Sequence, residues 1–298
     1  MNPLQMKLEY FAVAGFSALF RIMPYWLVRL KATFLGWFAA RVVKFRKSVA
    51  MDNLHHAFPG KSAQELERVY LNCWQHFMRV GAELARLPLL NRDNIERYVD
   101  VSAHPLMGKL LERGKGILVA SGHIGNWEIL GAAMSAMGYP ITYVVTNQSN
   151  KRVEEWIDRM RQSLGIEIIP RREAVKGVLN ALKRNRVIAV LCDQDAGDAG
   201  VFVEFFGRKA STPRGPALFH LKTGAPILYV TCLYQRGGRY KIDLEEIKVP
   251  ELTEDREANI ASIMQAVTIR LEQDVRSHPE QWLWLHRRWK TEFIQPES

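Results

Sequence analysis

Residues 116–131 read GILVASGHIGNWEILG. The apolar run 116–121 is typical of a buried strand, and the glycine that follows it favours a turn. His123 stands directly after this strand, and Asn126 opens a segment of helical character that contains Glu128. A strand, a turn and a helix in this order predict one unit of an α/β sheet, with its polar side chains at the carboxyl end of the strand.

The same alternation continues along the chain and predicts an α/β fold with a central sheet covered by helices. Strands are expected at 116–121, 141–146, 166–169, 187–192, 226–234 and 240–247. Helices are expected near 62–88, 126–137, 151–164, 172–184, 214–223 and 255–276. Ser62 followed by Glu65 fits a capping box, and RGG at 236–238 joins the last two strands as a pair.

Positive charge and apolar side chains are concentrated at the N-terminus. The net charge is +10, and residues 1–50 hold eight Lys and Arg against one Glu. A basic, apolar segment of this kind fits an anionic membrane surface better than a nucleic acid, which would need basic residues interleaved with stacking aromatics. The cluster KFRK at 44–47 fits a cytoplasmic flank. We expect a membrane anchor at 1–47 and a second domain at 48–298.

The anchor is too basic for a secretory signal, and Arg21 interrupts its longest apolar run, Tyr10–Phe20. We expect one or two amphipathic helices in the membrane interface, with Trp26, Trp37 and the arginines near the headgroups. A tilted span with Arg21 reaching the interface and a pair of ordinary core-covering helices stay open. Elsewhere, the three cysteines show no paired spacing and are expected to be buried free thiols: Cys73, Cys192 and Cys232.

His123 and Glu128 are the central candidate pair. They do not share a helical face, but a histidine in the turn can meet a glutamate in the first helical turns. The glutamate would hold the imidazole in one tautomer, as a general base requires. Neither G-x-S-x-G nor HExxH is present, so the nucleophile is expected to arrive on the substrate, as a hydroxyl that attacks an activated acyl carbon. The alternative is a structural loop histidine beside a helix-start glutamate.

Further polar residues follow other predicted strands. Asp193 and Asp195 come after 187–192 and could bind a metal, orient a base, cap a loop or be ordinary loop carboxylates. A helix entered at Thr212, with Pro213 at its first position, could hold an anion together with Arg214. Glu204 is a further acid near this region.

Four arginines could clamp phosphate or carboxylate, or could line solvated helix faces: Arg159, Arg161, Arg171 and Arg172. The segment PEQWLWLHRRWK (279–290) suits either an interfacial rim or a structural tether. Its His286, like His104 and His220, is expected to be a packed or surface histidine.

Together these blocks resemble the lipid A biosynthesis acyltransferases, the late lauroyl- and myristoyl-transferases of lipopolysaccharide assembly. SGHIGNWEILG resembles the HX4(D/E) block of that family, and SVAMDNLHHAFPGKS resembles the region after its anchor. DQDAGDAGVFVEFFGRKASTPRG and TGAP are similar to its central block, and PEQWLWLHRRWK is similar to its C-terminal signature. The resemblance covers roughly residues 41–290, in the expected order.

The resemblance implies a glycerolphosphate-acyltransferase-like fold, with a mixed sheet flanked by helices, on the cytoplasmic face of a bacterial inner membrane. His123 would be the base and Glu128 its partner, while Arg161, with Arg159 as a fallback, would match the arginine of the family. Asp193 and Asp195 would belong to the site architecture. The supporting residues expected around them are Asn126, Arg171, Arg172 and Arg214.

The donor would be an acyl thioester on acyl carrier protein or coenzyme A, and an acidic carrier protein would suit a basic face. The acceptor would be a glycolipid hydroxyl. No cofactor, metal or nucleic acid is implied. The central block also resembles relatives that acylate other glycolipids, including phosphatidylinositol mannosides, so the acceptor stays open. A thioesterase and a non-catalytic lipid-binding protein are the rival functions.

Overall fold

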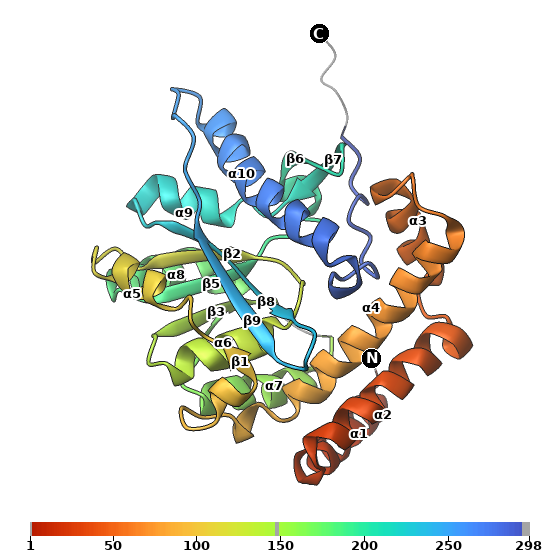
Figure 1. The fold of residues 1–298 in the computed structure, drawn as a ribbon. Helices are drawn as coiled ribbons and strands as arrows, with labels where there is room; N and C mark the ends of the chain where they lie inside the picture. Colours follow the sequence, from red (N-terminus) through yellow and green to blue (C-terminus); the bar gives the residue numbers. More distant parts are fainter. Residues whose placement is uncertain (1, 147–148, 294–298) are drawn as a thin grey trace.

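The computed structural model describes residues 2–146 and 149–293, and a seven-stranded mixed sheet lies at its centre (Figure 1). The strand order is β1-β9-β8-β2-β5-β3-β4. β2 is parallel to both of its neighbours, and β8 is antiparallel to β9. The strand bounds are β1 Val99–Asp100, β2 Ile117–Ser121, β3 Ile141–Val145, β4 Glu167–Pro170, β5 Val187–Leu191, β8 Ile227–Tyr234 and β9 Tyr240–Glu246. The predicted α/β fold with a mixed sheet is confirmed.

Helices cover both faces of this sheet, as the uninterrupted apolar sequence of β2 requires. Leu118 and Ala120 pack into a core with α8, α9 and α10, whereas Ile117 and Val119 pack into a second core with α5 and α6. The helices on the first face are α8 Ala174–Lys183, α9 Gly215–Thr223 and α10 Arg256–Ser277. Those of the second core are α5 Pro105–Leu111 and α6 Trp127–Ala136.

A small antiparallel hairpin, β6 Val201–Phe205 and β7 Arg208–Thr212, lies beside α10. This hairpin corrects the predicted helix start at Thr212. Thr212 is the last residue of β7, and α9 begins at Gly215 with Pro216 in its first turn. The run VFVEF alternates in burial along β6, as expected where only one face of a strand packs on a helix.

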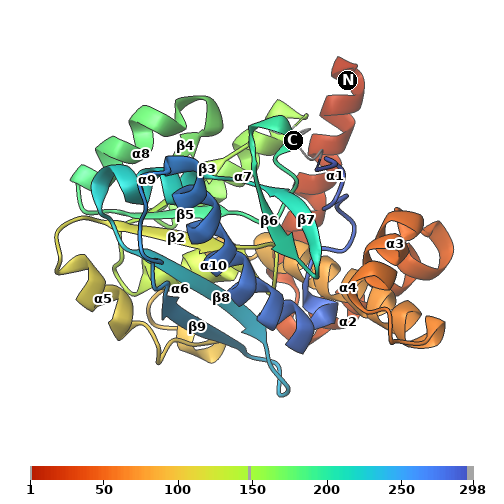
Figure 2. The ribbon, with the colours of Figure 1, turned by 90° about the horizontal axis from the view of Figure 1, so that it is seen from above.

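The N-terminal region forms α1 Pro3–Ile22, α2 Tyr25–Phe38, α3 Lys47–Ala57 and α4 Ala63–Leu84, which lie to one side of the sheet (Figure 2). Pro24 separates α1 from α2 because it disfavours helical dihedrals at Met23, whose ψ is 146°. The predicted capping box of Ser62 and Glu65 opens α4. None of the helices in residues 2–146 and 149–293 has the length and apolar character needed to cross a bilayer.

α2 packs against α4 through small residues. Val28, Ala32 and Gly36 are buried, and a Cβ at Gly36 would lie only 2.4 Å from the Cα of Gln75. One or two helices were expected in the N-terminal segment, and it forms α1 and α2. Their place in a membrane interface, like the boundary at residue 47, stays a prediction.

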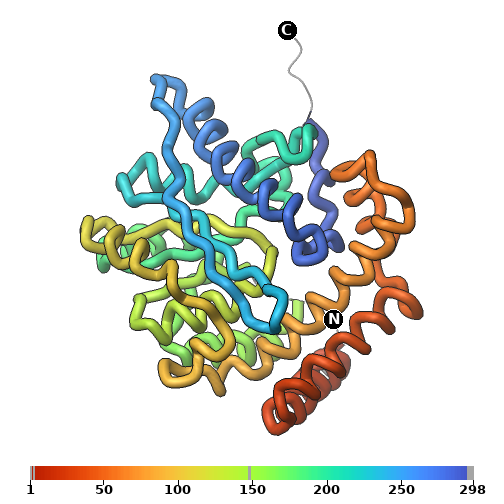
Figure 3. Tube along the Cα trace, viewed as in Figure 1, coloured from red at the N-terminus to blue at the C-terminus, as the bar shows by residue number. Residues whose placement is uncertain are grey.

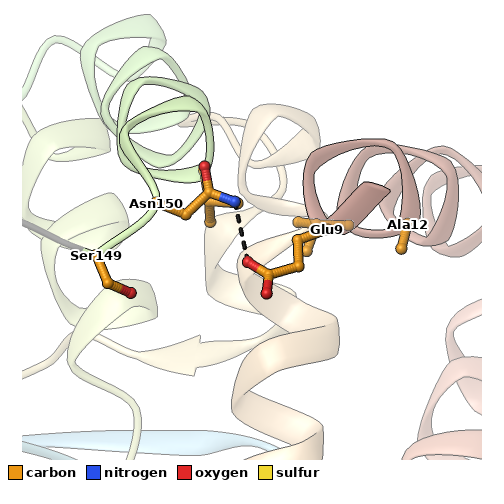
Figure 4. A pocket seen from close by; sticks show the side chains of 6 residues that line it. Glu9, Ala12, Ser149 and Asn150 are labelled. Atoms are coloured by element: carbon orange, nitrogen blue, oxygen red, sulfur yellow. Dashed lines mark hydrogen bonds between the residues drawn. The ribbon is translucent and has the colours of Figure 1, made fainter. Parts of the chain in front are cut away.

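α1 is held at both ends by hydrogen bonds to the body of the protein. Arg21 Nε donates to the carbonyl of Ala85 at 2.8 Å, so Arg21 turns inward and not toward the expected headgroup position. Near the other end, Asn150 Nδ2 donates to Glu9 Oε2 at 3.0 Å, just before α7 Lys151–Ser163 (Figure 4). A cavity of about 360 Å³ lies at this second contact, lined by Glu9, Ala12, Val13, Ser149, Asn150 and Val153.

Candidate active site

His123 and Asp193 meet because their strands are neighbours. β2 and β5 are parallel with Ser121 opposite Leu191, and each of the two side chains follows two residues later. His123 Nδ1 lies 2.7 Å from Asp193 Oδ1, and the His123 amide donates to Asp193 Oδ2 at 2.6 Å. A Cβ on Gly122 would lie 3.1 Å from the Asp193 carboxyl carbon, so glycine permits this close approach.

The Asp193 carboxylate is buried, with 2% exposure, and is fully engaged. Trp282 Nε1 donates to its Oδ2 at 2.9 Å. Burial alone would raise the pKa of Asp193, but His123 and the indole donor hold that pKa below its ordinary value. An ionised acceptor at Nδ1 fixes the imidazole tautomer with its proton on Nδ1 and its lone pair on Nε2.

This arrangement corrects the predicted partner of His123. Glu128 was expected to hold the imidazole, but its carboxylate receives Arg161 instead, with Nη2 to Oε1 at 2.5 Å and Nε to Oε2 at 3.1 Å. Asp193 holds His123, which is the base-orienting alternative left open for it. Burial would lower the pKa of Arg161, and Glu128 raises it above its ordinary value. The site therefore contains two basic side chains, each paired with its own carboxylate.

Trp127 lies between these two pairs. Its ring makes an edge contact with the His123 ring at 4.9 Å between centroids, and its Nε1 donates to Glu128 Oε1 at 3.1 Å. The His123 side chain keeps 19% exposure and that of Arg161 keeps 15%, so both side chains remain partly accessible from outside.

The turn that carries His123 is fixed from three sides. Gly125 has a φ of +62°, and a Cβ there would meet the carbonyl of Cys232 at 2.1 Å, so this glycine, more than Gly122, supplies the turn conformation. Its amide donates to the Gln281 carbonyl at 2.9 Å, and its carbonyl accepts from His76 Nε2 at 2.9 Å. Burial lowers the pKa of His76 to about 4, so this histidine is neutral.

Asn126 is a supporting residue with a defined role. Its Oδ1 accepts from the amides of Glu128 and Ile129 and caps α6. Its Nδ2 donates to the buried carboxylate of Glu83 at 2.7 Å. Sequence reasoning missed both Glu83 and His76. A sequence signal for these two residues does exist. His76 and Glu83 are two helical turns apart on a face of α4 that is otherwise apolar, which is typical of buried polar residues with specific partners.

The remaining predicted site residues lie apart from the two pairs. Asp195 accepts from the Thr291 amide and hydroxyl, so it holds the C-terminal segment. Arg214 pairs with Glu257 and not with an open anion site. Arg159 pairs with Glu155 across a solvated helix face.

Arg171 and Arg172 are exposed on the short helix after β4, and Arg172 contacts Glu173. Glu204 is exposed on β6, where its backbone pairs with Gln265. None of these arginines or acids is brought into contact with His123 by an interaction among the described residues.

The C-terminal segment 279–291 is the predicted structural tether. In Figure 3 it is dark blue, begins beside α4 and continues past α3, and its Leu283 amide donates to the His123 carbonyl at 3.1 Å. Trp282, Trp284 and Trp289 are buried, which excludes the alternative of an interfacial rim. Arg288 is 1% exposed and donates to the Ser211 carbonyl and to Thr212 Oγ1. Burial lowers the pKa of Arg288 to about 10.

The chemistry available here is proton transfer with charge stabilisation. Over residues 2–146 and 149–293, no group of three or more His, Cys, Asp and Glu side chains could hold a metal ion. The cysteines are buried free thiols, as predicted: Cys73, Cys192 and Cys232. What remains is a tautomer-fixed imidazole beside a carboxylate-bound arginine, a pattern suited to deprotonating a hydroxyl and supporting an anion.

Comparison with known proteins agrees with this chemistry. A family model described as bacterial lipid A biosynthesis acyltransferase matches residues 2–291. A phosphatidylinositol mannoside acyltransferase of Mycobacterium tuberculosis is 27% identical over 279 residues, which cover 85% of this chain and 86% of that protein. A lipid A biosynthesis palmitoleoyltransferase of Escherichia coli is 26% identical over 286 residues, or 93% and 89% of the two chains. The Escherichia coli lauroyltransferase is 26% identical over 275 residues, or 90% and 87%.

The fold and the site thus define an acyltransferase. The chain belongs to the bacterial lipid A biosynthesis acyltransferase family, because the family model covers nearly all of it. The family resemblance inferred from the separate sequence blocks is confirmed.

Proposed function

We propose that this acyltransferase moves a fatty acyl chain from an acyl thioester to a hydroxyl of a glycolipid at a membrane surface, with His123 as general base. The observation that carries the proposal is the bond between His123 Nδ1 and the buried Asp193 carboxylate. This bond leaves the lone pair on Nε2 and stabilises the imidazolium that forms when Nε2 takes a proton.

The reaction then follows from that lone pair. Nε2 removes the proton of the acceptor hydroxyl as its oxygen attacks the carbonyl carbon of the thioester. The tetrahedral intermediate collapses, the carbon–sulfur bond breaks, and Nε2 returns the proton to the leaving thiolate. The products are an ester and a free thiol. No cofactor takes part in these steps.

We assign Glu128 and Arg161 a supporting role. A bidentate carboxylate fixes the plane of the guanidinium, and Arg161 keeps 15% exposure. A fixed cation near the base can stabilise a developing oxyanion or hold a phosphate of the substrate. Glu128 therefore acts through Arg161, and Asp193 acts through His123.

The surface of α1 and α2 supports docking on a membrane. Seven large apolar side chains on these helices are at least 60% exposed: Leu4, Leu8, Phe11, Ile22, Trp26, Leu30 and Phe34. Contiguous exposed apolar surface beside basic residues is typical of helices that lie in the interface of anionic lipids. We propose that these helices hold the enzyme on the cytoplasmic face of a bacterial inner membrane.

The names of the relatives support two glycolipid classes as the acceptor to propose. Their names include lipid A acyltransferases and phosphatidylinositol mannoside acyltransferases at 26–27% identity. We propose a lipid A precursor as the first acceptor to test and a phosphatidylinositol mannoside as the second. The donor is an acyl chain on acyl carrier protein or coenzyme A.

A transfer assay in detergent tests the proposal. Purified protein receives C12 or C14 acyl chains on either carrier, together with a tetraacyl lipid A precursor or a phosphatidylinositol mannoside, and mass spectrometry reads the products. We expect a gain of one acyl chain, lost in His123→Ala and retained in His55→Ala, a change at an exposed histidine of α3. Transfer retained in His123→Ala contradicts the assignment of the base. Free fatty acid without acylated lipid indicates a thioesterase, and vesicle binding without thioester consumption indicates a non-catalytic lipid-binding protein.

A further inference from the structure

Glu83 is a buried carboxylate that the proposed chemistry does not use. It lies on α4 with 3% exposure and receives three donors: Tyr25 Oη at 2.5 Å, Asn126 Nδ2 at 2.7 Å and Tyr240 Oη at 2.7 Å. Burial raises the pKa of Glu83, and burial together with Glu83 raises the pKa of Tyr25, which therefore stays protonated as a donor. Burial of a carboxyl group away from water costs free energy of folding unless hydrogen-bond donors replace the water. The three donors to Glu83 supply this replacement.

Glu83 belongs to one face of α4 that holds the catalytic segments. Cys73 Sγ donates to the Trp282 carbonyl at 3.3 Å, His76 Nε2 donates to the Gly125 carbonyl at 2.9 Å, and Glu83 accepts from Asn126. These positions are three and seven residues apart, which is about one and two helical turns, so they lie on the same face of α4. α4 thereby contacts both the turn that carries His123 and the segment that carries the indole donor of Asp193.

Asn126 connects Glu83 to the first turn of α6. Its amide nitrogen is held by Glu83, while its amide oxygen caps the first turn of α6 at the amides of Glu128 and Ile129. Its backbone amide donates to the Cys232 carbonyl at 2.8 Å. Asn126 lies three residues after His123, and rotation of its side chain would therefore break the cap of the helix that carries Glu128.

Tyr25 brings the N-terminal helices into the same network. It is the first residue of α2, directly after the break at Pro24, and its hydroxyl donates to Glu83 Oε1. Further along α2, Gly36 allows close contact with the backbone of α4. The pair of helices with the exposed apolar surface and the turn with His123 thus share one buried carboxylate.

We infer that Glu83 is a positioning residue for acyl transfer, and that the chain Tyr25–Glu83–Asn126 couples the seating of α1 and α2 to the alignment of His123 and Glu128. This inference rests on the proposed function. Loss of the hydrogen bond from Tyr25 of α2 to Glu83 would loosen the cap of α6 and misalign His123. No group that touches substrate would be removed.

Tyr25→Phe tests the coupling, with Tyr70→Phe as its matched control. Tyr70 is a buried tyrosine, whereas Tyr25 is half-buried, and the Tyr70 hydroxyl joins α4 to the carbonyl of Phe45 at 3.3 Å, away from the His123 turn. We expect Tyr25→Phe to lower kcat by roughly tenfold or more, with the KM for the thioester within about twofold of wild type, because misalignment affects the reacting geometry more than binding. Hydrogen exchange at the amides of Glu128 and Ile129 should become faster in Tyr25→Phe and stay unchanged in Tyr70→Phe.

A second variant separates hydrogen bonding from charge. In Glu83→Gln the carboxamide oxygen can accept from Asn126 and Tyr240, and its nitrogen can donate to the Tyr25 hydroxyl. In Glu83→Gln we expect kcat and the exchange rates of the Glu128 and Ile129 amides to stay close to wild type. In Glu83→Ala we expect kcat to fall and exchange at these two amides to become faster. The inference is overturned if Tyr25→Phe matches Tyr70→Phe in kcat and in amide exchange. If wild type transfers no acyl chain, the proposed function fails, whereas amide exchange still reports whether α2 and the cap of α6 are coupled.

Discussion

The two ends of the chain have similar compositions and opposite surroundings. Trp26 and Trp37, near the N-terminus, are 67% and 43% exposed, whereas Trp282 and Trp284, near the C-terminus, are 1% and 0% exposed. Both regions combine tryptophan with arginine, and both suited a membrane interface by composition.

The difference lies in what each end packs against. The C-terminal segment fills the space between α4, α10 and the carboxyl ends of the strands, where Trp282 reaches Asp193 and the Trp284 indole donates to the Pro279 carbonyl at 2.6 Å. In the N-terminal region, α2 buries only a narrow stripe against α4 and α1 packs on α7, while both helices leave large apolar side chains exposed. Aromatic and basic composition therefore indicates an amphipathic segment, but the available partner surface decides whether that segment faces inward.

The largest expected effect comes from the carboxylate that the C-terminal segment holds. In Asp193→Asn the amide cannot accept from both His123 Nδ1 and its other donors, so the imidazole loses its fixed tautomer. We expect kcat to fall by roughly a thousandfold or more. Turnover at saturating donor checks this, with Asp198→Asn, at an exposed aspartate of the same loop, as the control. Turnover within about tenfold of wild type would show that Asp193 does not orient the base.

A smaller effect is expected from substitutions on the exposed face of α2. They should weaken binding to membranes and leave folding unchanged. Replacing Trp26, Leu30 and Phe34 by Ser removes apolar surface that is at least 60% exposed. We expect the partition constant onto anionic phospholipid vesicles to fall by at least about tenfold, because interfacial affinity scales with buried apolar area.

Vesicle flotation measures this partition constant. The matched control replaces three exposed apolar residues outside the N-terminal helices by Ser, namely Val175, Leu252 and Ile269, which are 68%, 49% and 51% exposed. Equal vesicle binding by the two triple variants would mean that α2 is not the docking surface.

The smallest expected effect compares one tryptophan from each end. Trp282→Phe keeps an aromatic ring against Phe205 but removes the indole donor to the buried Asp193 carboxylate. We expect the free energy of unfolding to fall by about 1–3 kcal/mol, since a buried acceptor loses a partner. Trp26→Phe, at an exposed position, should change it by less than about 0.5 kcal/mol. Urea denaturation measures the free energy of unfolding of both variants. A similar decrease in Trp282→Phe and Trp26→Phe would refute the contrast between the two ends of the chain.

Most of the fold could be predicted from the sequence because its signals are local. Apolar runs marked every strand of the central sheet except the two-residue β1, and Ser62 with Glu65 marked the start of α4. The hairpin of β6 and β7 is not predicted by the sequence, because the stretch before Thr212 fits either a strand or a loop that enters a helix. A strand that packs on a single helix carries a weak periodic signal, so its neighbour in space had to define it.

The sequence by itself determined which residues are available for chemistry at the carboxyl ends of the strands: His123 after one strand, Asp193 after another, and Glu128 in the helix between. Only the tertiary structure decided which carboxylate pairs with which basic side chain. The adjacency of β2 and β5 places Asp193 at His123, and the position of α7 next to β4 brings Arg161 to Glu128. Side-chain period and turn residues are properties of neighbouring positions in the chain, whereas strand order and helix packing depend on contacts between distant segments, which no local pattern encodes.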